Sequence, residues 1–209
     1  MTFTQYSDHA ELLKARFFEW KHGLGIVQNL ALALTYACLT GLMAQTSFYL
    51  PWTPVPVTGQ TFAVLLGAVL LGRWGGTSQL IYTLAGAAGL PWFAGWKGGL
   101  AAIAGPTGGY LIGFIIAAFF VGYLTEKFEQ ARSYAGLAVL MVFANLFFVY
   151  GFGLAQLYIW LSLAKGSSIG FQHLLSIGAL PFMIGDAFKI AAAVIAVKAA
   201  LPKEEEEKE

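Results

Sequence analysis

Long apolar runs, separated by short polar or glycine-rich segments, are the dominant pattern of this chain. A helix of about 20 apolar residues can cross the hydrocarbon core of a bilayer. The runs predict six spanning helices, near residues 25–44, 60–71, 78–93, 109–124, 137–163 and 174–201. The second and third are short and are joined by a tight turn at residues 72–76, so we interpret them as a hairpin whose depth in the membrane the pattern does not set.

The composition places the chain among integral membrane proteins. Of its 209 residues, 58% are hydrophobic and only 11% are charged, and the mean hydropathy is +0.68. A soluble domain of this size is far less apolar. The net charge is only +1, and the charged residues lie mainly in loops and at the chain ends. A nucleic-acid-binding protein needs a basic face, so a nucleic-acid partner is not expected. The sequence therefore predicts an all-α membrane protein whose partners are lipid, a small molecule or another membrane subunit.

Three regions follow from this pattern. Residues 1–24 carry mixed charges and lack a signal-peptide pattern, so we expect a cytoplasmic segment that includes a short amphipathic helix on the membrane surface. Residues 25–201 form the six-helix transmembrane domain. Residues 202–209 form a charged cytoplasmic tail.

The distribution of basic residues predicts the orientation of the helices. Cytoplasmic loops of membrane proteins carry an excess of lysine and arginine. With both termini cytoplasmic, the outer loops hold only Lys97 and Lys165, and the inner side holds Lys14, Arg16, Lys21, Arg73, Lys127, Arg132, Lys198, Lys203 and Lys208. The outer loops are instead rich in aromatic residues, proline and glycine, at 49–56 and 91–96. These loops suit a lid over a ligand, and an interfacial aromatic belt explains them equally well.

Asp186 and Lys189 are the most informative polar residues, because both lie inside the last apolar run. Ionisable groups at membrane depth are costly and usually face a cavity. Residues three apart share one face of a helix, so these two side chains can point together into the bundle. They either neutralise each other as a structural ion pair, or they bind a ligand that offers a carboxylate to Lys189 and N–H donors to Asp186.

Other polar residues are expected to converge on the same region. Thr58 and Gln60 stand where the second span begins, Tyr110 opens the fourth span, and Asn145 lies in the fifth. Each of them taken alone is also explained as a helix cap or a packed polar group. The glycine-rich segment 105–110 offers a weak anion site or simply close helix packing.

The first span carries a stripe of small residues, Ala33, Ala37 and Gly41, spaced by four. Small residues allow another helix to approach closely. The stripe therefore predicts contact either with a neighbour inside the bundle or with a separate subunit, and the sequence alone does not choose between them.

Several enzyme classes are excluded or weakened by the sequence. Residues 166–170 match the nucleophile-elbow pattern of serine hydrolases, but they connect two helices instead of a strand and a helix. The three histidines are scattered, so no metal site is expected. The chain also lacks a phosphate-binding loop with Gly-Lys-Ser/Thr, so any ATP hydrolysis must come from another protein.

Four segments carry a family resemblance. Residues 54–61 (PVPVTGQT), 86–95 (GAAGLPWFAG), 105–114 (GPTGGYLIGF) and 185–189 (GDAFK), in this order, resemble the BioY family of biotin transporters. The resemblance extends from about residue 33 to residue 192. It implies the fold of an S component, the substrate-binding subunit of an energy-coupling factor (ECF) transporter. S components are bundles of six helices that work with a transmembrane T component and two cytoplasmic ATPases.

The resemblance also implies a binding site. Biotin, as transported substrate and not as a cofactor, has a ureido ring, an apolar thioether ring and a tail that ends in a carboxylate. We expect Lys189 to receive the carboxylate and Asp186 to accept from a ureido N–H. Gln60 and Tyr110 would complete the polar contacts, and Trp92 and Phe93 would cover the apolar rings.

The same resemblance assigns a role to the small-residue stripe. Ala33 and Ala37 resemble the Ala-x-x-x-Ala motif by which S components dock on the T component. In the loop after Phe93, many relatives have a glycine followed by an arginine where this chain has Trp96 and Lys97, and a lysine cannot reproduce the fork of an arginine. The alternative to an S component is an autonomous, ion-coupled biotin carrier in which Asp186 and Lys189 exchange protons.

Overall fold

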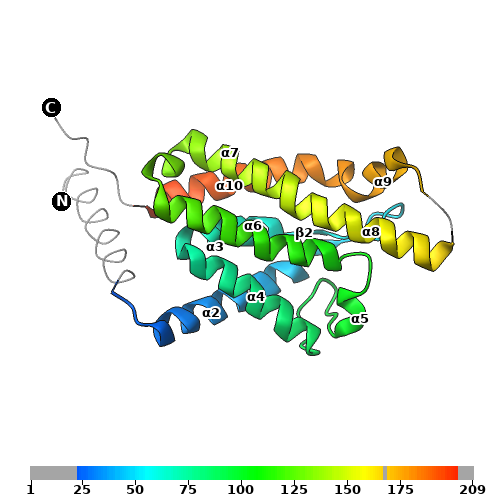
Figure 1. Ribbon diagram of the computed structural model, residues 1–209, viewed down its shortest axis with the longest axis horizontal. Coiled ribbons are helices and arrows are strands. Elements are labelled where there is room, and N and C mark those ends of the chain that lie inside the picture. The colour runs from blue at the N-terminus through cyan, green and yellow to red at the C-terminus, as the bar shows by residue number, and fades with distance from the viewer. Residues whose placement is uncertain (1–22, 167–168, 202–209) are drawn as a thin grey trace.

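The computed structural model describes residues 23–166 and 169–201 as a helical bundle with two short strands (Figure 1). The elements are α2 (Ile26–Gln45), β1 (Ser47–Phe48), β2 (Val57–Thr58), α3 (Gln60–Leu71), α4 (Arg73–Ala87), α5 (Leu100–Ile103), α6 (Gly108–Lys127), η1 (Glu129–Arg132), α7 (Tyr134–Ala144), η2 (Asn145–Val149), α8 (Tyr150–Lys165), α9 (Phe171–Gly178) and α10 (Leu180–Ala200). The expected amphipathic helix before residue 23 and the charged tail after residue 201 lie outside the described residues.

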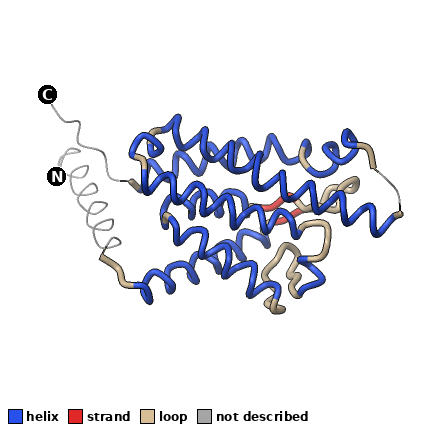
Figure 2. The backbone as a smooth tube through the Cα atoms, in the orientation of Figure 1, coloured by secondary structure: helices blue, strands red, loops and turns tan. Residues whose placement is uncertain are grey.

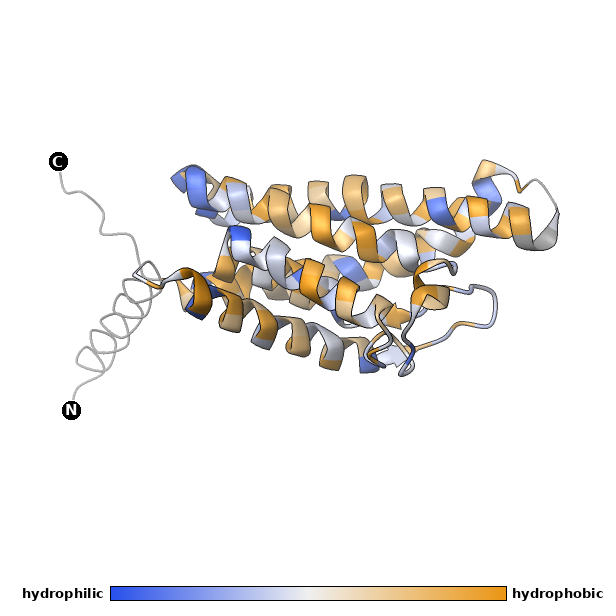
Figure 3. Ribbon diagram, turned by 60° about the horizontal axis from the view of Figure 1, so that its bottom comes forward, coloured by the Kyte–Doolittle hydropathy of each residue, from blue (hydrophilic) through white to orange (hydrophobic). Residues whose placement is uncertain are grey.

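Among the described residues, four helical segments are long and apolar enough to cross a membrane. They are Ile26–Gln45, Gly108–Lys127, Tyr134–Leu163 and Leu180–Ala200. α3 is apolar but has only 12 residues, and α4 has 15. The helices are predominantly hydrophobic along their length (Figure 3), as expected for surfaces that face lipid. The bundle is therefore a multi-pass membrane fold, with four long spans and a shorter helical pair.

Two of the expected spans, the sixth and the third, differ clearly from the structure. The last apolar run is not one helix, because the chain breaks at Ala179 (φ −133°, ψ −59°) between α9 and α10. Pro181 stands in the first turn of α10, where a missing N–H does no harm, so it can begin a helix but not continue one. The third run begins earlier than expected, at Arg73, because Gly72 turns the chain sharply with φ +63°.

α6 lies at the centre of the bundle and packs against α3, α4, α7 and α8. Its contacts with α8 and η2 depend on Gly109 and Gly113. A Cβ atom at either glycine would collide with the backbone carbonyl of Phe152 or Phe148. Glycine removes this obstacle and brings the two helix backbones together, so the packing interpretation of these glycines holds.

The small-residue stripe of α2 faces the inside of the bundle. Ala33 and Ala37 have no exposed surface, and Gly41 is buried against the ring of Trp92. α2 packs mainly on α4, with α3 as its second neighbour. Their neighbours among the described residues belong to the same chain, which favours a contact inside the bundle. The assignment of Ala33, Ala37 and Gly41 to subunit docking stays a prediction.

Two long loops gather at one end of the bundle, together with α5 and α9 (Figure 2). The loop between α2 and α3 contains the antiparallel pair β1–β2, in which Ser47 pairs with Thr58 and Phe48 with Val57. The loop after α4 is closed by a bridge between Phe93 and Lys97. α2 begins and α10 ends at the opposite end of the bundle.

Candidate substrate-binding site

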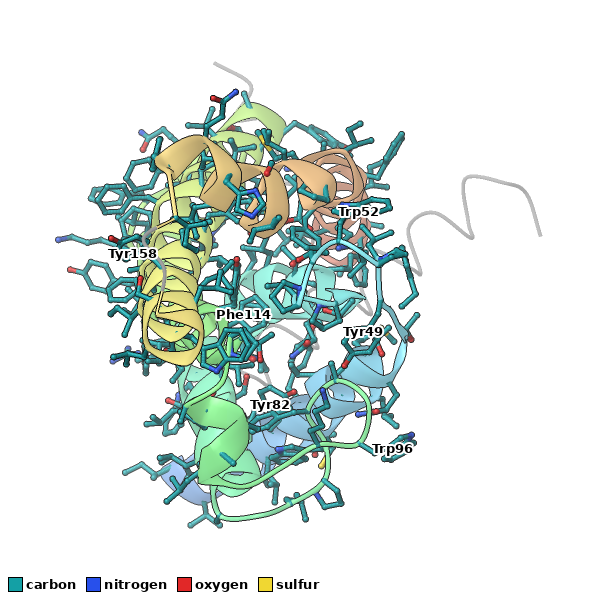
Figure 4. The ribbon with its side chains drawn as sticks, turned by 90° about the vertical axis from the view of Figure 1, so that its right-hand side faces the viewer. Tyr49, Trp52, Tyr82, Trp96, Phe114 and Tyr158 are labelled. Atoms are coloured by element: carbon teal, nitrogen blue, oxygen red, sulfur yellow. The ribbon has the colours of Figure 1, made fainter. Side chains whose placement is uncertain are left out.

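A cavity of about 400 Å³ lies between the helices and beneath these two loops. Its walls come from α3, α6, α10, the start of α8 and the loop segments around residues 54–58 and 93–98. Figure 4 looks onto this end of the molecule and shows Phe114 and Tyr82 in the interior, with Trp96 and Tyr158 pointing away from it. The volume lies in the range of small-molecule sites.

The carboxylate of Asp186 is the buried polar centre of the cavity. Its Oδ2 atom accepts hydrogen bonds from Asn145 Nδ2 at 2.9 Å and from the Tyr150 hydroxyl at 2.7 Å. Its Oδ1 atom accepts from Lys189 Nζ, also at 2.9 Å. Asp186 is only 5% exposed, and a carboxylate this deep is tolerated because three donors surround it.

The expected convergence of Asp186 and Lys189 is thus a direct ion pair across one turn of α10. The side chain of Lys189 keeps 19% of its surface exposed, whereas the side chain of Asp186 keeps 7%. Lysine carries a flexible four-carbon stem, so its ammonium can move to a new acceptor while the carboxylate stays in place. The pair can therefore offer one acceptor and one donor to the same polar edge of a ligand.

Gln60 lines the cavity at the first position of α3. Its Nε2 atom donates to the Tyr82 hydroxyl at 3.0 Å, and that hydroxyl donates to the Trp92 carbonyl at 3.2 Å. The Trp92 indole donates back to the Tyr82 carbonyl at 2.9 Å. This chain of hydrogen bonds fixes the Gln60 amide and leaves its carbonyl oxygen available to a donor in the cavity.

Tyr110 stands at the start of α6 and lines the same cavity. Its hydroxyl donates to the Gly178 carbonyl at 2.7 Å, at the end of α9. Its ring meets that of Tyr150 edge to face, with centroids 6.5 Å apart. A Cβ atom at Gly153 would collide with the Tyr110 ring, so the glycine makes room for it.

The structure brings most of the sequence-predicted site residues together. Thr58, Gln60, Phe93, Tyr110, Asp186 and Lys189 all line the cavity. Asn145 is not part of the lining, but it contacts Asp186 from behind. Trp92 is also outside the lining, because its ring packs on Gly41 and Tyr82.

The rim of the cavity carries a second cation. Lys97 is exposed, lines the cavity and holds its Nζ atom 5.3 Å from the centroid of the Tyr49 ring. Tyr49 lies in the first long loop and Lys97 in the second. Their cation–π contact therefore joins the two loops over the cavity.

Several residues of the site were missed by the sequence analysis. Gln45 donates to the carbonyls of Trp92 and Phe93, at 3.0 and 3.2 Å, and accepts from the backbone N–H of Trp96 at 3.1 Å. Tyr82 supports Phe93 edge to face, with centroids 5.4 Å apart. The polar side chain of Gln45 at the end of an apolar helix could have indicated a role in the site. The sequence around Tyr82 and Tyr150 contains nothing that distinguishes them from other tyrosines of membrane helices.

The first loop is also held at the far side of the cavity. The Thr53 hydroxyl donates to the Ile177 carbonyl at 2.5 Å and accepts from the N–H of Val55 at 3.1 Å. Thr53 is buried, so this contact connects the loop firmly to α9. The loops therefore form an ordered cover over the cavity, which supports the lid interpretation of residues 49–56.

Together these groups suit a small molecule with one hydrogen-bonding head, an apolar body and an anionic tail. The buried end offers acceptors and a donor from Asp186, Lys189 and Gln60. The apolar walls come from Phe93, Phe114 and Phe182. The rim carries the positive charge of the exposed Lys97.

Comparison with known proteins points in the same direction. Residues 11–205 match the BioY family. The probable biotin transporter BioY of Methanothermobacter thermautotrophicus is 44% identical over 140 residues, which cover 66% of this chain and 89% of the relative. The biotin transporter BioY of Thermotoga maritima is 41% identical over 152 residues, which cover 71% and 83%.

A solved structure resembles the fold. The crystal structure of the S component for biotin from an ECF-type ABC transporter superposes with a TM-score of 0.70 at 25% sequence identity. The similarity covers 82% of this chain and 89% of that one. The helical bundle described above therefore matches the fold of an ECF S component.

Proposed function

Because the chain belongs to the BioY family, we propose that its cavity binds biotin and that the protein takes biotin up across the cell membrane as the S component of an ECF transporter. The observation that carries this proposal is the buried Asp186–Lys189 pair in the wall of an otherwise largely apolar cavity of about 400 Å³. A small organic ligand with complementary polar groups can replace this mutual contact.

The ureido group is assigned to the buried pair. Asp186 Oδ1 would accept a ureido N–H, and Lys189 would turn from Asp186 to the ureido carbonyl. Because Nζ of Lys189 and Oδ1 of Asp186 are 2.9 Å apart, both groups serve one end of the ligand. This assignment replaces the expectation that Lys189 receives the carboxylate. The bicyclic ring and the valerate chain separate the ureido group of biotin from its carboxylate, so a lysine beside Asp186 cannot contact the carboxylate while Asp186 contacts the ureido group.

The carboxylate of biotin is assigned to Lys97 at the rim. An anion placed there keeps part of its hydration, so the free-energy cost of burying it is small. Gln60 and Thr58 would contact the bicyclic ring from α3 and β2, and Tyr110 from α6. Phe93 would cover the apolar face of this ring. Trp92 is assigned a supporting role behind Tyr82, not a contact with the ligand.

The membrane arrangement extends the four long spans to six. In this proposal α3 and α4 supply the two remaining, shorter spans, and both termini are cytoplasmic. The distribution of lysine and arginine supports the orientation. The position of the start of α2 and the end of α10 at the same end of the bundle agrees with an even number of crossings.

The proposed partners are a transmembrane T component and two cytoplasmic ATPases. The sequence lacks a phosphate-binding loop of its own, so energy from ATP must reach the chain through other subunits. Since Ala33 and Ala37 are buried, contact with the T component is assigned to outward-facing residues of α2, among them Leu34 and Thr35.

The second candidate function is an autonomous, ion-coupled biotin carrier. The observation that favours it is the same buried ion pair, because an ionisable pair at membrane depth can exchange protons during transport. Uptake of biotin into liposomes that contain the purified chain separates the two functions. Uptake that needs the ATPase module supports the S component, whereas uptake driven by a pH gradient alone supports the carrier.

Binding itself is tested by titrating the detergent-purified chain with biotin and with desthiobiotin in a calorimeter. We expect stoichiometric binding of both ligands, because desthiobiotin keeps the ureido ring and the carboxylate and loses only the sulfur. Glu126→Gln serves as the matched control, since Glu126 pairs with Arg73 at the opposite end of the bundle. A wild-type chain that binds no biotin, by calorimetry and by equilibrium dialysis, would refute the proposal.

A further inference from the structure

The chain from Tyr134 to Lys165 runs as one long helix, α7 to α8 (Figure 1). A π-helical turn, η2, lies between these two α-helical parts. Asn145 is the first residue of this turn, and Tyr150 follows it directly. In a regular α-helix, residues five apart point about 140° away from each other. In a π-helical turn, the i→i+5 hydrogen-bond pattern places them on the same face.

This turn has a direct consequence for the cavity. Asn145 Nδ2 and the Tyr150 hydroxyl both donate to the same atom, Oδ2 of Asp186, at 2.9 and 2.7 Å. The π-helical turn therefore aligns two donors, five residues apart, on one oxygen of a carboxylate that belongs to another helix.

The two oxygens of Asp186 are thereby given different roles. Oδ2 is engaged by the two donors from the long helix, while Oδ1 contacts only Lys189 among the described residues. The Tyr150 ring is itself held edge to face by Tyr110. The plane of the carboxylate is fixed from behind, so Oδ1 is the atom presented to a ligand.

Asn145 also carries an unsatisfied polar atom. Its Oδ1 is buried and has no hydrogen-bond partner among the described residues, and the residue is only 2% exposed. A buried polar atom without a partner costs free energy and needs an explanation. The explanation offered by the geometry is that the amide must turn its NH₂ group toward the Asp186 carboxylate, which leaves its oxygen unpaired.

We propose that Asn145 and Tyr150 are positioning residues for ligand binding: through the π-helical turn they hold Oδ2 of Asp186, so that Oδ1 accepts a single ureido N–H. This inference rests on the proposed function and deepens it. It predicts that the site recognises ligands with one N–H donor next to a carbonyl, because Lys189 is the neighbouring donor on the same edge.

The test compares Tyr150→Phe with Tyr158→Phe in the full-length, detergent-purified chain. Tyr158 is exposed on the same helix and points away from the bundle (Figure 4), so it controls for loss of a hydroxyl. The ligands are biotin and an analogue methylated on both ureido nitrogens. We expect Tyr150→Phe to weaken biotin binding by about tenfold to a hundredfold, the range for a hydrogen bond to a charged group. Tyr158→Phe should leave it unchanged.

The methylated analogue separates positioning from a general structural role. It cannot donate to Asp186 Oδ1, so its weaker binding should change less than threefold between the wild-type chain and Tyr150→Phe. Equal losses for both ligands, or no loss for biotin, would overturn the inference. Asn145→Leu, which keeps the size of the side chain, provides the same comparison if Tyr150→Phe does not fold. Absence of biotin binding by the wild-type chain would instead overturn the proposed function, and this inference with it.

Discussion

Lys189 Nζ lies 2.9 Å from Oδ1 of Asp186, and both side chains line the same cavity. Two opposite charges in contact neutralise each other, which explains how a membrane helix tolerates them. A ligand that enters must separate the pair or bind across it. The following predictions examine this arrangement and the packing that surrounds it.

The first prediction distinguishes the two lysines of the cavity. Lys189→Ala should weaken biotin and biotin amide by the same amount, about 2–5 kcal/mol, because both ligands keep the ureido group and Asp186 is left unpaired. Lys97→Ala should weaken biotin but spare the amide, because only the acid has a carboxylate for the rim. Calorimetric titration of both variants with both ligands measures this. If Lys189→Ala weakens the binding of biotin but not of biotin amide, Lys189 contacts the carboxylate of biotin, contrary to the assignment to Lys97.

The second prediction concerns the acceptor itself. Asp186→Asn removes the negative charge but keeps the size of the side chain, so an NH₂ group can replace the oxygen that accepts the ureido N–H. We expect a loss of about 2–5 kcal/mol in biotin binding, the range for one partner of a buried charged contact. Glu126→Gln, at the other end of the bundle, should bind biotin normally. Equal affinities of the two variants would remove Asp186 from the site.

The third prediction uses a glycine behind the cavity wall. A Cβ atom at Gly86 would collide with the Phe93 ring, which is itself a lining residue. Gly86→Ala should therefore displace Phe93 and weaken biotin binding without any change of charge. Gly151→Ala is the control, because the added methyl group meets no atom within 4 Å. It should leave binding intact and stabilise the helix by about 0.5–1 kcal/mol. Thermal unfolding and titration of both variants measure the outcome.

The fourth prediction concerns the small-residue stripe of α2. Ala37 has no exposed surface, whereas Ala31 on the same helix is exposed. Ala37→Leu should destabilise the protein by about 1–3 kcal/mol, because a well-packed interior cannot accept the added carbons. Ala31→Leu should unfold at the same temperature as the wild-type chain. If Ala37→Leu unfolds normally but no longer co-purifies with a T component, Ala37 would contact that subunit, as the docking assignment predicts.

The apolar pattern predicted much of the fold. The segment 60–71 became α3 with the same boundaries, because Gly59 and Gly72 enclose a continuous apolar run. The run 174–201 did not predict the break at Ala179, since the residues on both sides are equally apolar and the sequence shows only Pro181. The stripe at Ala33 and Ala37 indicated close packing, but spacing alone does not name the neighbour.

Spacing alone predicted only the part of the site whose residues are neighbours in the sequence. Asp186 and Lys189 share a helix face by their spacing alone, and the structure joins them. Tyr150 could not be assigned to the site, because the orientation of its side chain depends on a π-helical turn that no local sequence pattern predicts. Gln45 reaches carbonyls 47 and 48 residues away, and such contacts depend on how the loops close.

The cavity has a consequence for the behaviour of the protein without a ligand. Its walls come from α3, α6, α10, the start of α8 and two loops, so the cavity interrupts the close packing that is usual in protein interiors. Bound biotin would fill the cavity, and its binding to the folded state would raise the melting temperature by mass action. Loaded and empty forms would then differ in rigidity, which gives any partner subunit a mechanical means to tell them apart.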